Sequence, residues 1–269
     1  MRLPIAILLL SVALGQMAQA ATVGPTERFL PLIHDGGGWS TQITVTNLSE
    51  SPAQVVAAFL TAAGYAEPWR PALKLSSGKA SGGTVEVSLV PGATAVIETS
   101  GTAAILTRGF AEVVETGDRP LGVSATLTQK DAAGQIVRSI AIPFSAAHER
   151  RSVMPIDLSD PRQKPLMIWV SMTSSVVLDV TFRNLAGEVV LTDQVNLNGR
   201  AQLFVDVREQ WQALKDFRGV MQWSVTFPFA DRYEPRTLGA LLVLASDGRP
   251  WAALSGMTLP SDQASIEPY

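Results

Sequence analysis

The sequence predicts an all-β protein made of two antiparallel, Ig-like β-sandwich domains in tandem, with one short helix in the second domain. Three observations predict it. Apolar and polar residues alternate over short segments, turn-forming residues separate these segments, and the order of signals in residues 43–144 returns in residues 168–260. A fixed order with unequal gaps is typical of two copies of one β-rich unit whose insertions are confined to loops.

Five signals recur in the same order in the two copies. The first copy has Phe59, Gly64, Pro91-Gly92, Arg108-Gly109 and Leu121-Gly122, and the second has Phe182, Gly187, Asn198-Gly199, Arg218-Gly219 and Leu238-Gly239.

In the first copy, alternation predicts seven strands. These are residues 43–46, 53–61, 84–89, 95–98, 109–115, 121–129 and 135–143. Each strand ends at turn-forming residues, and Pro91-Gly92 predicts a type II turn. Residues 67–83 contain prolines, lysines and a Ser-Gly cluster, and we expect them to form a loop insertion that the second copy lacks.

In the second copy, the same pattern predicts seven further strands. These are residues 166–171, 176–183, 189–197, 203–207, 220–227, 238–245 and 251–259. One helix is expected over residues 207–215. Asp206 can cap it, Glu209 follows three residues later as in a capping box, and Val207, Trp211 and Leu214 share one face.

The strands are short and no helical crossover joins them, which favours antiparallel pairing. Two such sheets bury their apolar faces against each other, although a closed barrel is an alternative. The expected division is a signal peptide at 1–20, a lead-in at 21–28, sandwich domains at 29–147 and 148–260, and a tail at 261–269. Because residues 145–151 are too few for a flexible spacer, the domains should pack together or sit in a stiff relation.

The first 20 residues have the features of a secretory signal peptide. Arg2 is followed by the apolar run 5–14 and by Ala18-Gln19-Ala20, a small-residue cleavage site. A membrane anchor is the competing interpretation, but it needs roughly 20 apolar residues. The chain has no cysteine, which excludes disulfides, thiolate metal sites and lipoprotein acylation. We therefore expect a periplasmic or secreted protein with no membrane attachment after cleavage.

The formal net charge is −3, and loss of Arg2 with a signal peptide would make it −4. Neither value offers the basic surface that nucleic acid or anionic lipid requires. The sequence therefore predicts no nucleic-acid partner.

Few residues suggest reaction chemistry. His34, Asp35 and Ser40 lie close in sequence, but triads assemble from separate elements, so a flexible glycine loop ahead of a strand is the preferred interpretation. The two histidines, His34 and His148, do not have metal-ligand spacing. We expect no metal, no cofactor and no catalytic residues.

A pair of carboxylates for glycoside hydrolysis would be set by the fold. Glu86, Glu98 and Glu112 alternate with apolar residues on predicted strands, so we expect them on solvated outer faces.

The aromatic residues divide into two groups. Trp169, Trp223 and Trp251 fall in predicted strands and Trp211 in the helix, which favours core positions. The residues predicted in loops are candidates for contact with a partner: Trp39, Trp69, Phe229 and Tyr233.

The segment Gly36-Gly37-Gly38-Trp39-Ser40-Thr41 before an alternating strand resembles a repeat of predicted secreted bacterial proteins of unknown function. Leu203 to Asp206, followed by Phe217-Arg218-Gly219, resembles the later part of that repeat. The second copy departs from it, with residues 161–165 in place of the Gly-Gly-Gly-Trp segment. The resemblance implies an Ig-like surface or periplasmic module and brings no catalytic residues.

The predicted function is an exported, non-enzymatic binding or structural module that contacts an unknown protein or glycan partner through sandwich loops or edge strands. The alternative is a carbohydrate-binding protein that uses loop aromatics, and a secreted hydrolase is the third hypothesis.

Overall fold

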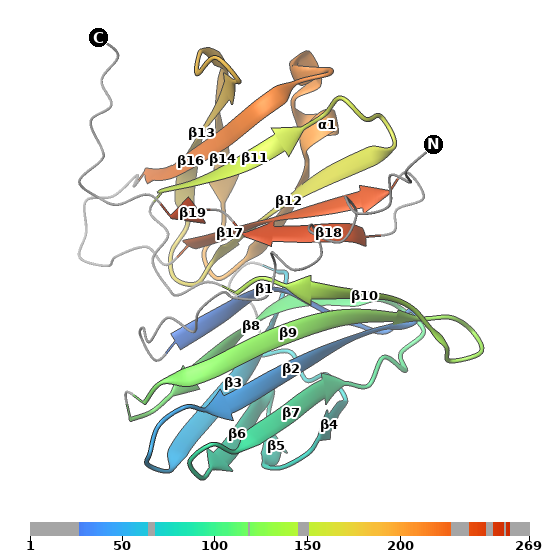
Figure 1. Ribbon diagram of the computed structural model, residues 1–269, viewed down its shortest axis with the longest axis vertical. Helices are drawn as coiled ribbons and strands as arrows, with labels where there is room; N and C mark the ends of the chain where they lie inside the picture. The colour runs from blue at the N-terminus through green and yellow to red at the C-terminus, as the bar shows by residue number, and fades with distance from the viewer. Residues whose placement is uncertain are drawn as a thin grey trace, which may run out of the picture.

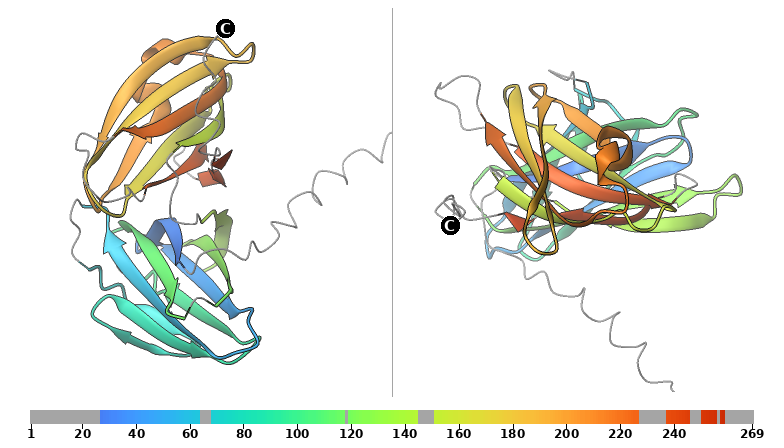
Figure 2. Two further views of the ribbon diagram at one scale, coloured as in Figure 1. Left: turned by 90° about the vertical axis from the view of Figure 1, so that its left-hand side faces the viewer. Right: turned by 90° about the horizontal axis from the view of Figure 1, so that it is seen from above.

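The computed structural model describes residues 27–63, 68–117, 119–144, 151–226, 237–245, 250–255 and 257–258. These residues form four antiparallel sheets in two facing pairs, which are stacked along the long axis of the molecule (Figures 1 and 2). The all-β sandwich architecture predicted from the sequence is confirmed. In this described part of the chain, each sheet is open, with an edge strand on either side.

The first pair of sheets contains ten strands: β1 (Glu27–Asp35), β2 (Trp39–Asn47), β3 (Ala53–Thr61), β4 (Leu73–Leu75), β5 (Lys79–Ser81), β6 (Thr84–Leu89), β7 (Thr94–Thr99), β8 (Thr107–Glu115), β9 (Leu121–Lys130) and β10 (Ile136–Ile142). One sheet has the order β1-β8-β3-β6-β5 and the other β10-β9-β2-β7-β4.

The second pair contains β11 (Arg151–Asp157), β12 (Gln163–Ser171), β13 (Val176–Asn184), β14 (Val189–Leu197), β15 (Gln202–Asp206), β16 (Arg218–Thr226), β17 (Thr237–Ala245), β18 (Pro250–Ser255) and β19 (Met257–Thr258). The sheet orders are β14-β13-β16-β11-β19 and β15-β12-β17-β18. Between β15 and β16 lie the helix α1 (Val207–Gln210) and the 3-10 helix η1 (Gln212–Leu214).

The two pairs of sheets share one topology. The order β1-β8-β3-β6 corresponds to β11-β16-β13-β14, and β10-β9-β2-β7 corresponds to β18-β17-β12-β15. The Arg-Gly signals occupy matching places, because Gly109 pairs with Thr61 and Gly219 pairs with Asn184. The repeated order of sequence signals thus accompanies a repeated order of strands.

The first pair has two strands without counterparts. Residues 67–83 were predicted as a loop, but they contain β4 and β5. Strand β4 pairs with β7 and β5 pairs with β6, so each extends one sheet. In the described part of the second pair, the corresponding strands β15 and β14 have one neighbour each.

Pattern analysis missed strands β1 and β11. Residues 21–28 were expected to be a lead-in, whereas β1 already begins at Glu27, and residues 21–26 lie outside the described residues. Eight of the nine residues of β1 are buried, so both faces of the strand are covered. Such a strand lacks the alternation of apolar and polar residues that predicts a half-buried strand. A register shift between Leu30 and Ile33 accommodates Pro31, which cannot donate a ladder hydrogen bond.

The glycine segment ahead of β2 is a tight turn rather than the flexible loop that we expected. Gly36, Gly37 and Gly38 have φ of 92°, 59° and 81°. A Cβ on Gly36 would lie 2.3 Å from the carbonyl oxygen of Ile105. The turn therefore requires glycine both for its positive φ and for its close packing.

The predicted helix starts where expected and ends early. Asp206 caps α1, accepting hydrogen bonds from the backbone N–H groups of Arg208 (3.0 Å) and Glu209 (3.2 Å). Helix α1 stops at Trp211, whose backbone (φ −121°, ψ 67°) leaves the helical region. The Trp211 ring lies in the core, 4.9 Å from the Phe182 ring between centroids, so packing of this side chain accompanies the break.

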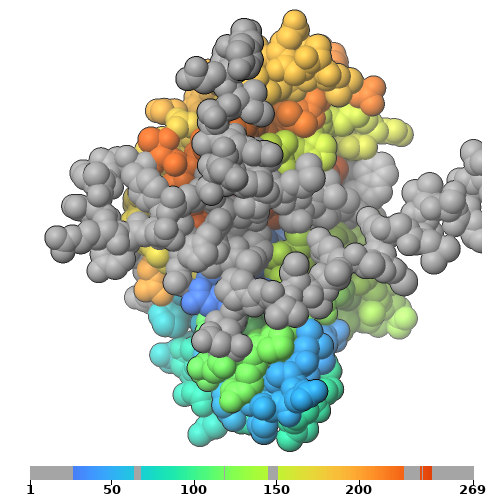
Figure 3. All heavy atoms as spheres, turned by 60° about the vertical axis from the view of Figure 1, so that its left-hand side comes forward, coloured from blue at the N-terminus to red at the C-terminus, as the bar shows by residue number. Residues whose placement is uncertain are grey.

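The buried apolar residues form two clusters, and one sheet contributes to both. Met167 and Trp169 of β12 belong to the second cluster, whereas Ile168 and Val170 of the same strand belong to the first. The sheet β15-β12-β17-β18 is therefore covered on both faces, and the two sheet pairs pack together. Figure 3 shows the first pair, in blue and green, below the second pair, in yellow and orange. Trp169 and Trp223 are fully buried, as predicted, and the Trp251 side chain lies outside the described residues.

Gln202 joins the two sheet pairs through polar contacts. Its backbone N–H donates to the carbonyl of Ala62 (3.2 Å), and its Nε2 donates to the carbonyls of Pro31 and Gly109. Next to it, the Arg108 guanidinium lies 5.4 Å from the centre of the Phe204 ring, within cation–π range. Polar and apolar contacts therefore both fix the position of one sheet pair relative to the other.

We predict that Gly219→Ala lowers the free energy of unfolding by about 1–3 kcal/mol, because the added Cβ would lie 2.0 Å from the Arg183 carbonyl oxygen. Gly122→Ala is the matched control. Its Cβ would meet Leu48 at 3.5 Å, an ordinary contact, and should change stability by less than about 0.5 kcal/mol. Urea unfolding of both variants checks this prediction, and equal effects would contradict it.

Candidate functional site: the open side of the second sheet pair

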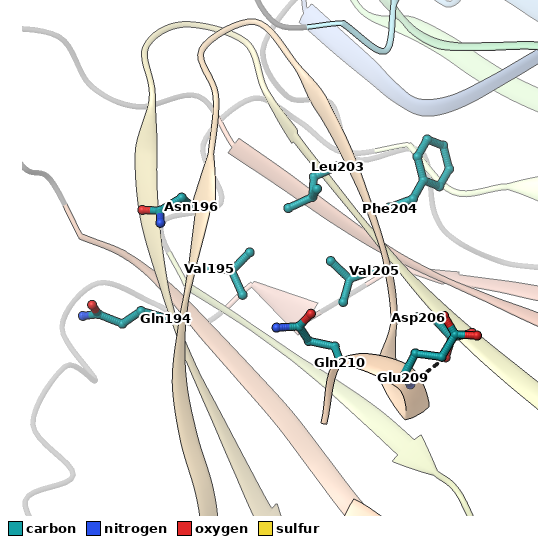
Figure 4. A pocket seen from close by; sticks show the side chains of 9 residues that line it. All are labelled: Gln194, Val195, Asn196, Leu203, Phe204, Val205, Asp206, Glu209 and Gln210. Atoms are coloured by element: carbon teal, nitrogen blue, oxygen red, sulfur yellow. Dashed lines mark hydrogen bonds between the residues drawn. The ribbon is translucent and has the colours of Figure 1, made fainter. Parts of the chain in front are cut away.

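A cleft lies between the two facing sheets of the second pair, on the side where both sheets end. Strand β14 is the edge of one sheet and β15 the edge of the other. Helix α1, which follows β15, closes one end of the cleft (Figure 4). The cleft is thus the unsealed side of a β-sandwich.

The cleft has an apolar floor and a polar rim, and its volume is about 460 Å³. The floor consists of Val195 from β14 with Leu203 and Val205 from β15, and the side chains of Val195 and Val205 face each other in Figure 4. The polar side chains on the rim are those of Asp206, Glu209 and Gln210. Gln194 and Asn196 also line the cleft, but their side chains point away from it in Figure 4, and Gln194 Nε2 donates to Asp179 Oδ1 at 2.7 Å.

Both rim carboxylates are held by one cation. Lys164 Nζ lies 2.8 Å from Asp206 Oδ2 and 3.0 Å from Glu209 Oε1. Hydrogen bonds to Asp206 and then to Glu209 raise the pKa of Lys164 above its ordinary value, so the lysine stays charged at neutral pH. Because the carboxylates share this partner, they are not poised as a free acid and base. The rim can instead offer the Gln210 amide and a mild negative charge.

The helix beside the cleft is held in place by Arg208. Its guanidinium donates to the backbone carbonyls of Gln163 (2.9 Å), Leu158 (2.7 Å) and Asp160 (2.7 Å). On the opposite wall, Asp193 of β14 accepts a 2.8 Å hydrogen bond from Trp211 Nε1. These contacts fix α1 and β14 relative to each other, so the cleft is formed before any partner arrives.

Of the four predicted contact residues, the structure describes Trp39 and Trp69. Trp39 begins β2 and is only 8% exposed, with its ring 5.6 Å from that of His34. Trp69 is half-buried and packs edge-on against Phe59. Phe229 and Tyr233 lie outside the described residues. The two described tryptophans therefore lie in or against the core of the first sheet pair.

The sequence neighbours His34, Asp35 and Ser40 are all buried but do not form a triad. Asp35 Oδ1 accepts from the Gly101 N–H at 2.7 Å, and neither ring nitrogen of His34 has a hydrogen-bond partner. The carbonyl of His34 accepts from the Thr41 and Thr99 hydroxyls at 2.9 and 3.0 Å. Each of these hydrogen bonds joins a side chain to a backbone group, so they stabilise the local structure.

The carboxylates that we considered for hydrolysis lie apart from the core. Glu86 is exposed, and Glu98 and Glu112 are half-buried on the outer faces of their sheets, as predicted. Among the described residues, no three His, Asp or Glu side chains gather as a metal site. The helices among the described residues are too short to span a membrane.

Pattern analysis missed one buried carboxylate, Glu115. It accepts from the backbone N–H groups of Gly117 and Arg119, both at 2.7 Å, and of Gln54 at 3.3 Å, and Arg119 Nη1 lies 3.1 Å away. Burial raises its pKa, but these donors outweigh burial and bring the pKa below the ordinary value. Glu115 is therefore an ionised anchor for the turn between β8 and β9.

The comparisons with known proteins do not identify a family for this chain. No protein-family model matches the chain, and no curated protein matches its sequence. Vicilin from Capsicum annuum is similar over 81% of this chain and 72% of its own, at 8% identity and a TM-score of 0.22. Similarity at this level carries no inference about function.

We predict that buried His34 makes the protein less stable in mild acid. Burial, and secondarily the charge of Arg108, lower its pKa from 6.5 to about 3, so the folded state binds the proton less readily than the unfolded state. The contribution of neutral His34 is complete above pH 6.5 and is lost as the pH falls towards 3. Between pH 8 and pH 5 the loss should be about 2 kcal/mol.

His34→Phe is the matched control, because it keeps a ring beside Trp39 and the His34 ring nitrogens bond nothing. Urea midpoints at pH 8 and pH 5 should differ less in this variant than in the wild type. An unchanged difference would show that His34 is not responsible.

Proposed function

We propose that this protein is an exported, non-enzymatic binding module that holds a partner polypeptide at the open side of its second sheet pair. The observation that carries the proposal is the cleft between β14 and β15, where two sheet edges flank an apolar floor. Edge strands with unpaired backbone groups bind extended polypeptides by adding a strand, and pockets beside the edge accept side chains.

A polypeptide suits this cleft better than a glycan does. Sugar-binding sites stack their ligands on exposed aromatic rings, and Phe204 is the one aromatic residue among the described residues of the cleft lining. Its side chain points away from the floor in Figure 4, and the Arg108 guanidinium lies 5.4 Å from the centre of its ring. Carbohydrate binding through Trp69 remains the alternative proposal, since that ring is only half-buried.

The exported location is also a proposal, and it rests on the sequence. Residues 1–20 have the order of a cleavable signal, and they lie outside the described residues. The resemblance of Gly36 to Thr41 to repeats of predicted secreted bacterial proteins points the same way. A periplasmic or secreted location follows from these two features.

A photocrosslinking experiment tests the proposal. The chain has no cysteine, so Gln194→Cys beside the cleft can carry a single maleimide-linked photocrosslinker. Irradiation with exported proteins of the cell of origin should give a polypeptide adduct. Ser139→Cys, on an exposed position of edge strand β10, should not give that adduct.

Equal adducts at both positions, or none at Gln194→Cys, would contradict this proposal. A glycan array serves as the second arm. Glycan binding that disappears in Trp69→Ala would favour the carbohydrate alternative instead.

A further inference from the structure

Among the described strands, β14 is a long sheet edge without an outer neighbour. It has nine residues and pairs only with β13. Val189 and Val190 at its start are each 50% exposed. Thr192, Gln194 and Asn196 are exposed and uncharged, and alternate with the inward-facing side chains of the strand. Its one charged residue, Asp193, is hydrogen-bonded to Trp211.

The other described edges are short or carry lysine, arginine or proline, except β1, whose residues are almost all buried. Proteins guard edges by keeping them short or by placing lysine, arginine or proline on them. Strands β4 and β5 have three residues each and carry Lys74 and Lys79, β10 carries Arg138, and β18 begins with Pro250. Strand β15 has five residues and β19 has two. Strand β14 has an inward-facing charge, Asp193, and a register shift between Leu191 and Val189, but it is nine residues long and its outward side chains are uncharged. A long edge of this kind is suited to pairing with another strand.

The first sheet pair shows what such pairing looks like. Strand β6 corresponds to β14, and β5 covers its edge in antiparallel register. The hairpins β6–β7 and β14–β15 have equal spacing, with a positive φ at Gly92 (72°) and at Arg200 (51°). This alignment places Gln194 at the position of Glu86.

The first pair has Glu86 on β6 where the second pair has Gln194 on β14. This difference affects which strand can pair with each edge. On β6, Lys79 of the covering strand lies opposite Glu86, so that pair is electrostatically complementary. In antiparallel pairing of identical strands, a charged residue on the two-fold axis would face its own copy and be repelled. Because the outward side chains of β14 are uncharged, a second β14 can lie beside it without repulsion.

We propose that β14 pairs antiparallel with β14 of a second copy of this chain about a two-fold axis. The two five-stranded sheets would then join into one continuous sheet, and the partner strand would lie along the open cleft. This inference rests on the proposed function, since it names the polypeptide that the open side holds.

Sedimentation velocity on protein purified from the exported fraction tests the inference. The wild type should show a concentration-dependent dimer. The double variant Thr192→Lys with Gln194→Lys should weaken it by about tenfold or more, because like charges would face each other along the paired strands. Ser139→Lys on β10 is the matched control and should leave the dimer unchanged. Thermal unfolding of each variant checks that the fold is retained.

Cysteine cross-linking gives an independent measurement. Gln194→Cys should be joined to itself in a second chain by a short bis-maleimide, whereas Ser139→Cys should not. A wild type that stays monomeric at every concentration, or a dimer that the lysines leave intact, would overturn the inference. A monomer whose Gln194→Cys photoadduct contains a different polypeptide would leave the proposed function standing. If neither the dimer nor the photoadduct were found, both this inference and the proposed function would be contradicted.

Discussion

The sheet β15-β12-β17-β18 must have apolar cover on both faces, and the architecture depends on that constraint. Trp169 faces the second cluster, while Ile168, Val170 and Leu242 belong to the first. Pulling the two sheet pairs apart would expose these side chains to water, at a cost of about 25 cal/mol for each Å² of apolar surface. The interface is therefore a continuation of the first core and not a contact between two finished surfaces.

The same constraint places β1. This strand is an edge of its sheet by hydrogen bonding, yet nearly all of its residues are buried. The Gln202 amide reaches the carbonyl of Pro31, which lies at the irregular register of β1. Polar groups at the interface are thus used to satisfy backbone carbonyls that the ladder leaves without a donor.

The two sheet pairs share a topology and differ at one side. The strands β4 and β5 extend both sheets of the first pair, and the described part of the second pair has nothing in their place. The cleft follows from this difference, because uncovered edges leave Val195, Leu203 and Val205 beside open space. The Asp206 and Glu209 carboxylates of the cleft share Lys164, and the Asp35 carboxylate beside His34 accepts from a backbone N–H, so these carboxylates have structural partners. For this reason, an interaction surface is the function that we propose.

The sequence by itself determined the fold class, most strands and the cap of the one helix, because these depend on local alternation, turn residues and the Asp206 side chain. It also contained the signal for the site, since residues 67–83 have no equivalent in the second copy. Only the tertiary structure decided that Trp39 is buried, that β1 is a strand and that β14 has no outer neighbour among the described strands. Burial on both faces removes the alternation that pattern analysis detects, and the exposure of an edge depends on which distant strand lies beside it.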